Sequence, residues 1–208
     1  MAFRQMIELF VFINPLDPEC FKANQMIIEF AQERTEKVNI RFVTSVLSQN
    51  SLRQLHYAYL KKMQRDDNQI FNADFIASLA VQAATMQGKK RGMQFLMTLQ
   101  SCLFEQGASF SEALVLEVAQ RVNLDLTMFQ EDLYSTLAKK AYTRDQHLAQ
   151  KMQITSTPTC VLYHCNSSNK AIKMSHHLSK ETLHQVCGDT FDNLTTQQFN
   201  QHPFFQIL

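Results

Sequence analysis

Asp17 and Cys20 stand where a strand-like run meets a helix-like run, with the spacing of a redox motif. They belong to the stretch FVFINPLDPEC, which runs from Phe10 to Cys20. In a thiol–disulfide exchange site, two cysteines with this spacing occupy a helix N-terminus, where the helix dipole lowers the pKa of the first thiol. That thiol attacks, and the second resolves the mixed disulfide. Here a carboxylate occupies the attacking position, so the dithiol cycle is not available.

The same residues are well suited to starting a helix. Asp17 is a favoured N-cap, and its carboxylate is expected to accept a hydrogen bond from the N–H of Cys20. Pro18 then falls at the first helical position, where its missing N–H costs nothing. Glu19 lies in the first turn, where negative charge is favoured. The stretch keeps a helix start and lacks the attacking thiol.

Three interpretations of Cys20 remain open. A buried structural thiol is favoured, because free cysteine most often behaves as a small core hydrophobe. A redox-sensing single thiol is the second, since a helix N-terminus can still acidify it. Metal ligation is the third.

A separate zinc candidate is His164 and Cys165, with Cys160, His176 and His177 nearby. Their spacing matches no standard zinc motif, and adjacent strand residues point to opposite faces, so no metal site is expected.

Hydrophobic patterning predicts the elements that position these residues. The run from Ile7 to Ile13 is apolar on both faces, as in a buried strand. Helical periodicity follows from Pro18 to about Glu36. Asn39 to Val46 returns to β-branched and aromatic chemistry. The crossover is long enough for the two strands to pair in parallel.

A block of helices is predicted next, from Ser51 to about Gln153. Its segments include SLRQLHYAYLKKMQR, which is amphipathic, and GMQFLMTLQSCLFEQG, which is apolar over most of its circumference. The expected helix caps in this block are Asn72 or Asp74, and Ser109 or Ser111. The expected helix stop is Gly88.

The remaining residues return to strand chemistry. ITSTPTCVLYHC and KAIKMSHH are predicted strands, joined by a hairpin loop at residues 166–169. A capped helix is expected from Ser179 to Gly188. The order is βαβ, a helical block, then ββα. It predicts an α/β protein with a thioredoxin-like (DsbA-like) fold carrying an inserted helical domain.

This topology divides the chain into three predicted parts. Residues 1–50 and 154–190 form a discontinuous thioredoxin-like domain, residues 51–153 the inserted helical domain, and residues 191–208 a C-terminal tail. The tail ends in Phe204, Phe205, Ile207 and Leu208. It is expected to pack back on the core, with an exposed docking segment as the alternative.

Thr157 and Pro158 form the second candidate site. In thioredoxin folds the proline before the third strand is cis and packs beside the helix start, and the backbone before it can pair with an extended partner chain. The position of Thr157-Pro158 between the helical block and a strand fits that role. The alternative is a trans proline that opens a strand.

NPLDPEC after a strand, the helical insertion, and TSTPT before a strand resemble the DsbA-like superfamily. Within it, FVFINPLDPECF is most similar to the SpxH (YjbH) group of cytosolic adaptor proteins. There the stretch often reads Asp-Pro-Leu-Cys-Pro-Glu-Cys followed by an aromatic, so Asn14 and Asp17 depart from the pattern. The resemblance implies a protein without cofactor that binds the redox-responsive transcription regulator Spx and presents it to the ClpXP protease.

An enzyme is the rival hypothesis: a thiol- or glutathione-dependent member of the same superfamily that uses Cys20. The missing first cysteine argues against an oxidoreductase. It leaves a protein-binding role untouched, because binding needs a surface and no thiolate. A third hypothesis is an interaction protein with another client.

Composition narrows the choice of partners and compartment. The 208 residues carry 20 basic and 19 acidic side chains, a net charge of +1. Such a balance argues against direct binding of nucleic acid or an anionic membrane, both of which need a concentrated positive face. No apolar run is long enough to span a bilayer. Five scattered cysteines indicate reduced thiols and a cytoplasmic protein.

Two short basic clusters complete the candidates. KKMQR covers Lys61 to Arg65, and GKKRG covers Gly88 to Gly92. Both are interpreted as solvated helix ends, where positive charge near a C-terminus is favourable. A patch for an acidic partner is the alternative.

Overall fold

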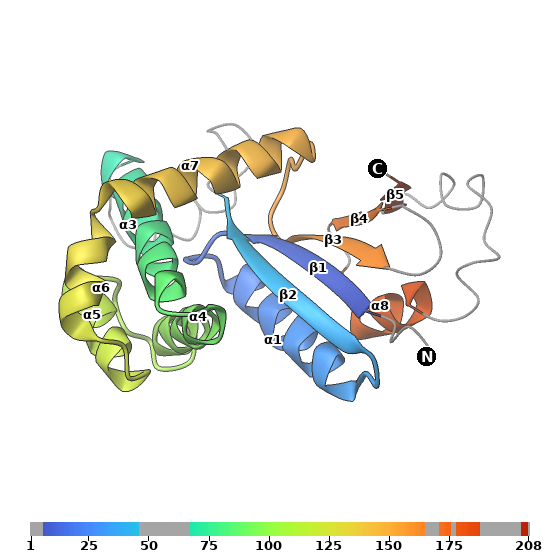
Figure 1. The fold of residues 1–208 in the computed structure, drawn as a ribbon, viewed down its shortest axis with the longest axis horizontal. Helices are drawn as coiled ribbons and strands as arrows, with labels where there is room; N and C mark the ends of the chain where they lie inside the picture. The colour runs from blue at the N-terminus through green and yellow to red at the C-terminus, as the bar shows by residue number, and fades with distance from the viewer. Residues whose placement is uncertain (1–5, 46–66, 165–170, 176–177, 188–204, 208) are drawn as a thin grey trace.

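The structure is a computed structural model that describes residues 6–45, 67–164, 171–175, 178–187 and 205–207. Several predictions lie outside these residues: the first part of the helical block, including KKMQR, Cys165, the loop at 166–169, the stop at Gly188 and most of the tail. In Figure 1 a twisted sheet occupies one half of the molecule, and a group of helices occupies the other.

The sheet has the predicted mixture of parallel and antiparallel pairs. Its strand order is β2-β1-β3-β4-β5. β1 and β2 pair in parallel, as the crossover predicted, and every other neighbouring pair is antiparallel. The strands are β1 (Met6–Ile13), β2 (Lys37–Thr44), β3 (Thr159–His164), β4 (Ala171–Ser175) and β5 (Phe205–Ile207).

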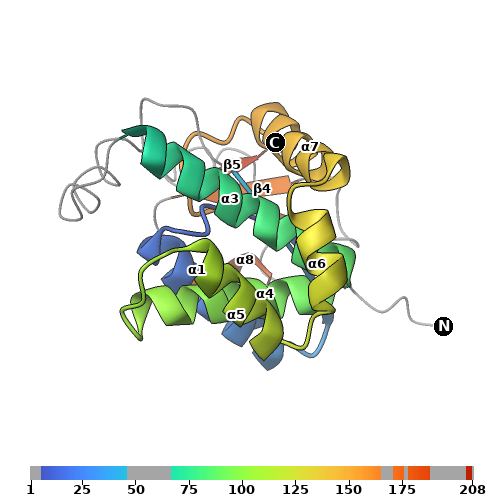
Figure 2. The same cartoon turned by 90° about the vertical axis from the view of Figure 1, so that its left-hand side faces the viewer.

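Helices cover both faces of the sheet and form the second half of the molecule (Figures 1 and 2). α1 follows β1, α3 to α7 lie between β2 and β3 in the chain, and α8 follows β4. Their bounds are α1 (Pro18–Glu33), α3 (Asp67–Met86), α4 (Lys89–Phe104), α5 (Glu112–Arg121), α6 (Leu126–Leu133), α7 (Thr136–Lys151) and α8 (Lys180–Val186). No helix in the described ranges is both long and apolar enough to span a bilayer.

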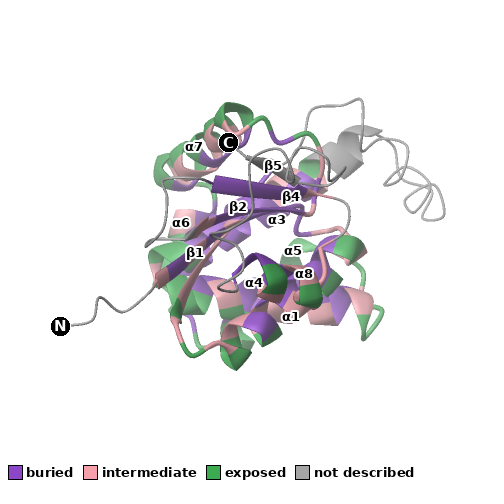
Figure 3. Cartoon of the chain, turned by 90° about the vertical axis from the view of Figure 1, so that its right-hand side faces the viewer, coloured by how far each residue is buried: buried purple, intermediate pink, exposed green. Residues whose placement is uncertain are grey.

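β1 is buried along one face, and on both faces at its C-terminal end (Figure 3). The second face is only half-buried as far as Phe10, so the predicted burial on both faces holds for the end of the strand. Leu9 and Val11 belong to a large core that also holds residues of α1 and α8. Phe12, on the opposite face, packs in a smaller cluster with Ala149 of α7. Successive strand residues point to opposite faces, so one strand supplies both layers.

The large core continues from the sheet into the inserted helices. It includes Leu79 of α3, Phe95 of α4, Val115 of α5 and Phe129 of α6, together with the β1 residues. One continuous apolar core therefore crosses the predicted domain boundary. The division into a thioredoxin-like domain and an inserted helical domain stays a prediction from the order of the elements along the chain.

Helix boundaries correct two predictions. α3 begins at Asp67, so neither Asn72 nor Asp74 is its cap. Gly88 follows the end of α3, as predicted, but it is also the N-cap of α4, at a φ of 131° that favours glycine. The GKKRG cations therefore begin a helix, whereas the sequence interpretation placed them at a helix C-terminus.

Other caps follow the sequence. Ser111 caps α5 and Ser179 caps α8, each through its hydroxyl. The tail contributes β5, which pairs antiparallel with β4 and so extends the sheet by one strand. The prediction that the tail returns to the folded domain is correct for these three residues.

Candidate functional site

The turn between β1 and α1 carries the first pair of candidate residues. Asn14 shapes it: the side-chain oxygen accepts from the Leu16 N–H at 2.9 Å, and the backbone oxygen accepts from the Asp17 N–H at 3.2 Å. From α4, the Gln100 amide donates to the Pro15 carbonyl at 3.2 Å. The inserted helices therefore help to hold the turn.

Asp17 is the N-cap of α1, with Pro18 at the first helical position. Its carboxylate accepts from the Glu19 N–H at 2.9 Å, one residue before the donor that the sequence predicted, the Cys20 N–H. A cap that bonds the second helical N–H still satisfies one of the free donors of the first turn.

Cys20 is fully buried behind this cap. Its thiol donates to the second Asp17 carboxylate oxygen at 3.4 Å and accepts from the Asn14 N–H at 3.4 Å. Burial, followed by the negative charge of Asp17, raises the pKa of Cys20 well above its ordinary value. The Asn14 N–H and the Thr157 hydroxyl act in the opposite direction on that pKa and are outweighed. The thiol stays protonated at neutral pH, which favours the structural interpretation.

Thr157 and Pro158 reach the same place from the other end of the chain. The Thr157–Pro158 peptide bond is cis, and β3 begins at the next residue. Thr157 is buried, and its hydroxyl lowers the pKa of Cys20. The fold thus brings together Asp17, Cys20 and the proline loop, which are about 140 residues apart in sequence.

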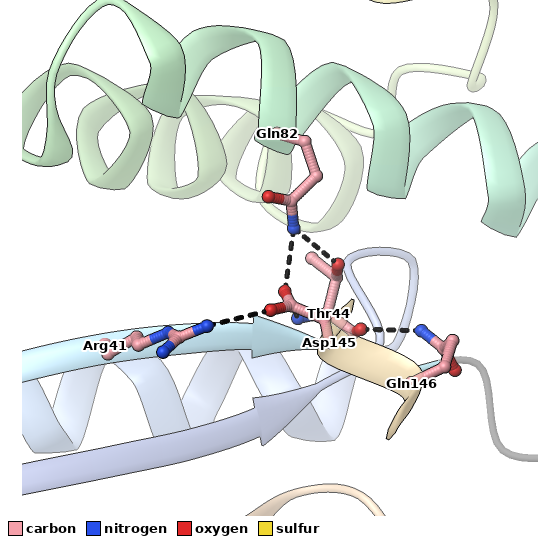
Figure 4. A network of polar contacts seen from close by, with 5 residues as sticks. All are labelled: Arg41, Thr44, Gln82, Asp145 and Gln146. Carbon is pink, nitrogen blue, oxygen red and sulfur yellow. Dashed lines mark hydrogen bonds and ion pairs between the residues drawn. The ribbon is translucent and has the colours of Figure 1, made fainter. Parts of the chain in front are cut away.

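A polar network that the sequence analysis missed joins the inserted helices to the sheet (Figure 4). Buried Asp145 of α7 accepts from Arg41 at 3.1 Å, from the Thr44 N–H at 3.2 Å and from Gln82 of α3 at 2.8 Å. Gln146 donates to the Thr44 carbonyl at 2.9 Å. The end of β2 is therefore capped by α7 side chains.

The sequence contained a signal for this network. Asp145 lies on the same side of α7 as buried Ala138 and Ala149, so it is a charge on an apolar face. Burial raises the pKa of Asp145, and the opposing attraction of Arg41 and the hydrogen bonds only partly offset that effect. A buried carboxylate with this many donors is a structural connection between elements.

The other described cysteines are also free and buried: Cys102, Cys160 and Cys187. Burial raises the pKa of Cys187 to about 12 and raises that of Cys160 further. Within the described ranges, no three His, Cys, Asp or Glu side chains gather in a way that would hold a metal ion. Cys165, His176 and His177, which the zinc alternative needs, lie outside those ranges.

Comparison with known proteins agrees with this architecture. A family model described as Thioredoxin matches residues 10–185. The ClpXP adapter protein SpxH of Bacillus subtilis is 29% identical over 207 residues, which cover 89% of this chain and 69% of that protein. These findings confirm the resemblance that NPLDPEC and TSTPT indicated.

Solved structures confirm the fold. A putative protein disulfide isomerase from Nitrosomonas europaea has a TM-score of 0.67 at 14% identity, covering 91% of this chain and 100% of that one. The oxidoreductase DsbA from Xylella fastidiosa has a TM-score of 0.62 at 12% identity, covering 90% and 85%. At such identities the likeness shows a DsbA-like fold and carries no activity with it.

Proposed function

Because the chain belongs to the thioredoxin family, we propose that it uses this fold to hold another protein. It acts as a cytoplasmic adaptor that binds a redox-responsive transcription regulator of the Spx type and promotes its degradation by the ClpXP protease. The curated relatives named as ClpXP adapters support this role.

One observation carries the proposal: the hydrogen bond from the Cys20 thiol to Asp17. A thiol that donates to a carboxylate and lies fully buried is neither ionised nor accessible to a disulfide. The helix start and the proline loop are nevertheless maintained in full. We therefore assign Asp17, Cys20, Thr157 and Pro158 to the architecture of a protein-binding surface.

The test uses the whole purified chain and an Spx-type regulator. We expect micromolar or tighter binding by calorimetry, together with faster ClpXP degradation of the regulator when the chain is added. Cys20→Ala should leave both measurements unchanged within about twofold, because the thiol makes no contact with a partner. Absence of binding at micromolar concentrations would remove the adaptor proposal for this client.

A thiol-dependent enzyme is the second candidate, and the oxidoreductase fold favours it. Asp17→Cys distinguishes the two functions. The replaced carboxylate lies 3.4 Å from the Cys20 sulfur, so the new thiol is placed to form a disulfide with Cys20. We expect the variant to gain insulin reduction with dithiothreitol and the wild-type chain to show none. Catalytic turnover by the wild-type chain would instead establish the enzyme.

A further inference from the structure

The large exposed apolar side chains of the described residues all lie on the inserted helices, on and beside α6. Their exposed fractions run from 36% to 64%. They lie on α6 and at the ends of α3 and α7 that meet it (Figure 2). They are Met86, Leu126, Met128, Tyr134 and Leu137, here called the α6 surface. Single exposed hydrophobic residues are ordinary on proteins, but five distributed along one short helix and on the helix ends beside it indicate an interaction site.

Hydrogen bonds fix the junction on which this surface lies. The Gln87 side chain donates to the Asp125 carbonyl at 2.9 Å and accepts from the Asp125 N–H at 2.8 Å. This pair joins the end of α3 to the start of α6, which brings Met86 close to Leu126. α6 buries Phe129 and directs Met128 outward.

A positive cluster adjoins the same junction. Lys89, Lys90 and Arg91 are exposed and occupy the first three positions of α4, directly after Gly88. Three cations at a helix N-terminus oppose the helix dipole, and Gly88 supplies no side-chain cap. No ion pair involving these three is found with another described residue. Neighbouring Asp125 uses its carboxylate to cap α6.

We propose that the α6 surface, together with Lys89, Lys90 and Arg91, binds an acidic amphipathic helix of a protein partner. The apolar face of such a helix covers the exposed Met and Leu side chains, and its acidic flank neutralises cations that have no ion pair among the described residues. Met suits this role because its unbranched side chain repacks against different shapes. Helix docking fits a surface built from helix ends, where no strand edge is open for pairing.

Charge selects this occupant over a second copy of the chain. An isologous dimer places the same patch on both sides of its interface, which brings two sets of these cations near each other. Like charges across an interface oppose association, whereas an acidic partner gains from them. The α6 surface would serve the adaptor role proposed above, but it does not depend on the client being Spx.

The test begins with a designed peptide, so that it stays independent of any client. The peptide is a labelled helix of about 18 residues with Leu at helical spacing and Glu on the other faces. A matched peptide carries Lys in place of Glu. We expect the full chain to bind the Glu peptide at least about tenfold more tightly than the Lys peptide, a difference of about 1.4 kcal/mol. The preference should shrink as salt is added.

The decisive variant is Lys89→Glu/Lys90→Glu. Because acidic residues suit a helix N-terminus, this change should raise the melting temperature while it weakens Glu-peptide binding about tenfold or more. Opposite movements of stability and binding exclude misfolding as the cause. Arg144→Glu/Lys151→Glu, with the same change in net charge on exposed α7 positions, should leave binding within about twofold. Met128→Gln should weaken binding of the Glu peptide.

Two results would overturn the inference: equal binding of the Glu peptide by wild type and Lys89→Glu/Lys90→Glu, or no preference for Glu over Lys peptide. Repeating the assay with an Spx-type regulator separates the two proposals. If the peptide result holds and the regulator does not bind, the adaptor proposal fails for that client and the α6 surface stands.

Discussion

At Cys20, burial and the charge of Asp17 act on the thiol in the same direction. Both disfavour the thiolate, and burial is the larger cause of the raised pKa. At a helix N-terminus the dipole by itself would lower the pKa of a thiol. Burial and the neighbouring carboxylate together keep protonated a thiol that a helix N-terminus would otherwise acidify.

Asp17→Asn tests that interpretation, because asparagine remains a good N-cap without the charge. The pKa of Cys20 should fall because the negative charge of Asp17 is removed, so alkylation of Cys20 by iodoacetamide at pH 8 should become several-fold faster. Mass spectrometry of the labelled chain measures the rate at Cys20 alone.

Asp17→Ala serves as the control for the cap. It removes the charge and the hydrogen bond to the Glu19 N–H together, and should cost about 1 kcal/mol in the free energy of unfolding. Alkylation that stays equally slow in both variants would mean that burial alone governs the thiol.

Between elements, α3 and α4 come into close contact at Gly92. A Cβ added there would lie 2.2 Å from the Thr85 hydroxyl oxygen and 2.9 Å from the Thr85 Cα. That hydroxyl donates to the Val81 carbonyl at 2.7 Å, so it is not free to move away. Glycine is required here by space rather than by backbone conformation.

Gly92→Ala should therefore destabilise the protein although alanine is the better helix former. Overpacking costs about 1–3 kcal/mol, against about 1 kcal/mol gained in helix propensity. Urea denaturation measures the net loss. Adding Thr85→Ala should recover only part of the lost stability, because the Thr85 Cα still lies within the contact. Full recovery would show that the hydroxyl alone excludes a side chain.

Asp145 predicts a pH dependence at the element scale. Its folded pKa is raised above the ordinary 3.8, so the folded protein binds this proton more tightly than the unfolded chain does. The contribution of Asp145 to stability is then fully present below pH 3.8 and decreases as pH rises through the folded pKa.

The comparison with Asp145→Asn isolates this effect. The difference in unfolding free energy, wild type minus variant, should decrease with rising pH across that window and be level above it. Urea titrations at a series of pH values from acidic to neutral measure the difference. A difference that grows with pH would mean that attraction to Arg41 outweighs burial.

At the scale of the whole molecule, distant segments complete the sheet and its coverings. β5 comes from the end of the chain and pairs with β4, aligning Ile207 with Ile172 and Phe205 with Met174. α7 closes the end of β2 through Asp145 and Gln146. Asn24 of α1 also donates to Gln100 of α4 at 2.9 Å, so inserted helices and sheet layer are joined at two places.

Deleting residues 205–208 tests the part played by β5. The deletion leaves the backbone groups along one edge of β4 unpaired, and an open edge promotes association with other chains. We expect faster amide hydrogen exchange at residues 171–175, a lower melting temperature and a rise in oligomers by light scattering. Unchanged exchange in β4 would show that β5 adds nothing to the sheet.

The fold could be predicted from the sequence because its signals are local. The run from Ile7 to Ile13, apolar apart from Glu8, predicts a strand inside the sheet, and Asp17-Pro18 fixes a helix start without help from the rest of the chain. The expected resemblance followed from the same short motifs. Errors came where the local signal was ambiguous: Gly88 suits both the end of one helix and the start of the next.

Only the tertiary structure decided which residues meet. Alternation along a strand shows that a residue is buried, but not against what, so Thr157 beside Cys20 and Asp145 beside Thr44 required the fold. The sequence by itself determined that the attacking thiol is absent, because side-chain chemistry is fixed by residue type. The raised pKa of the remaining thiol and the position of the GKKRG cations beside α6 depend on distances between elements, which only packing sets.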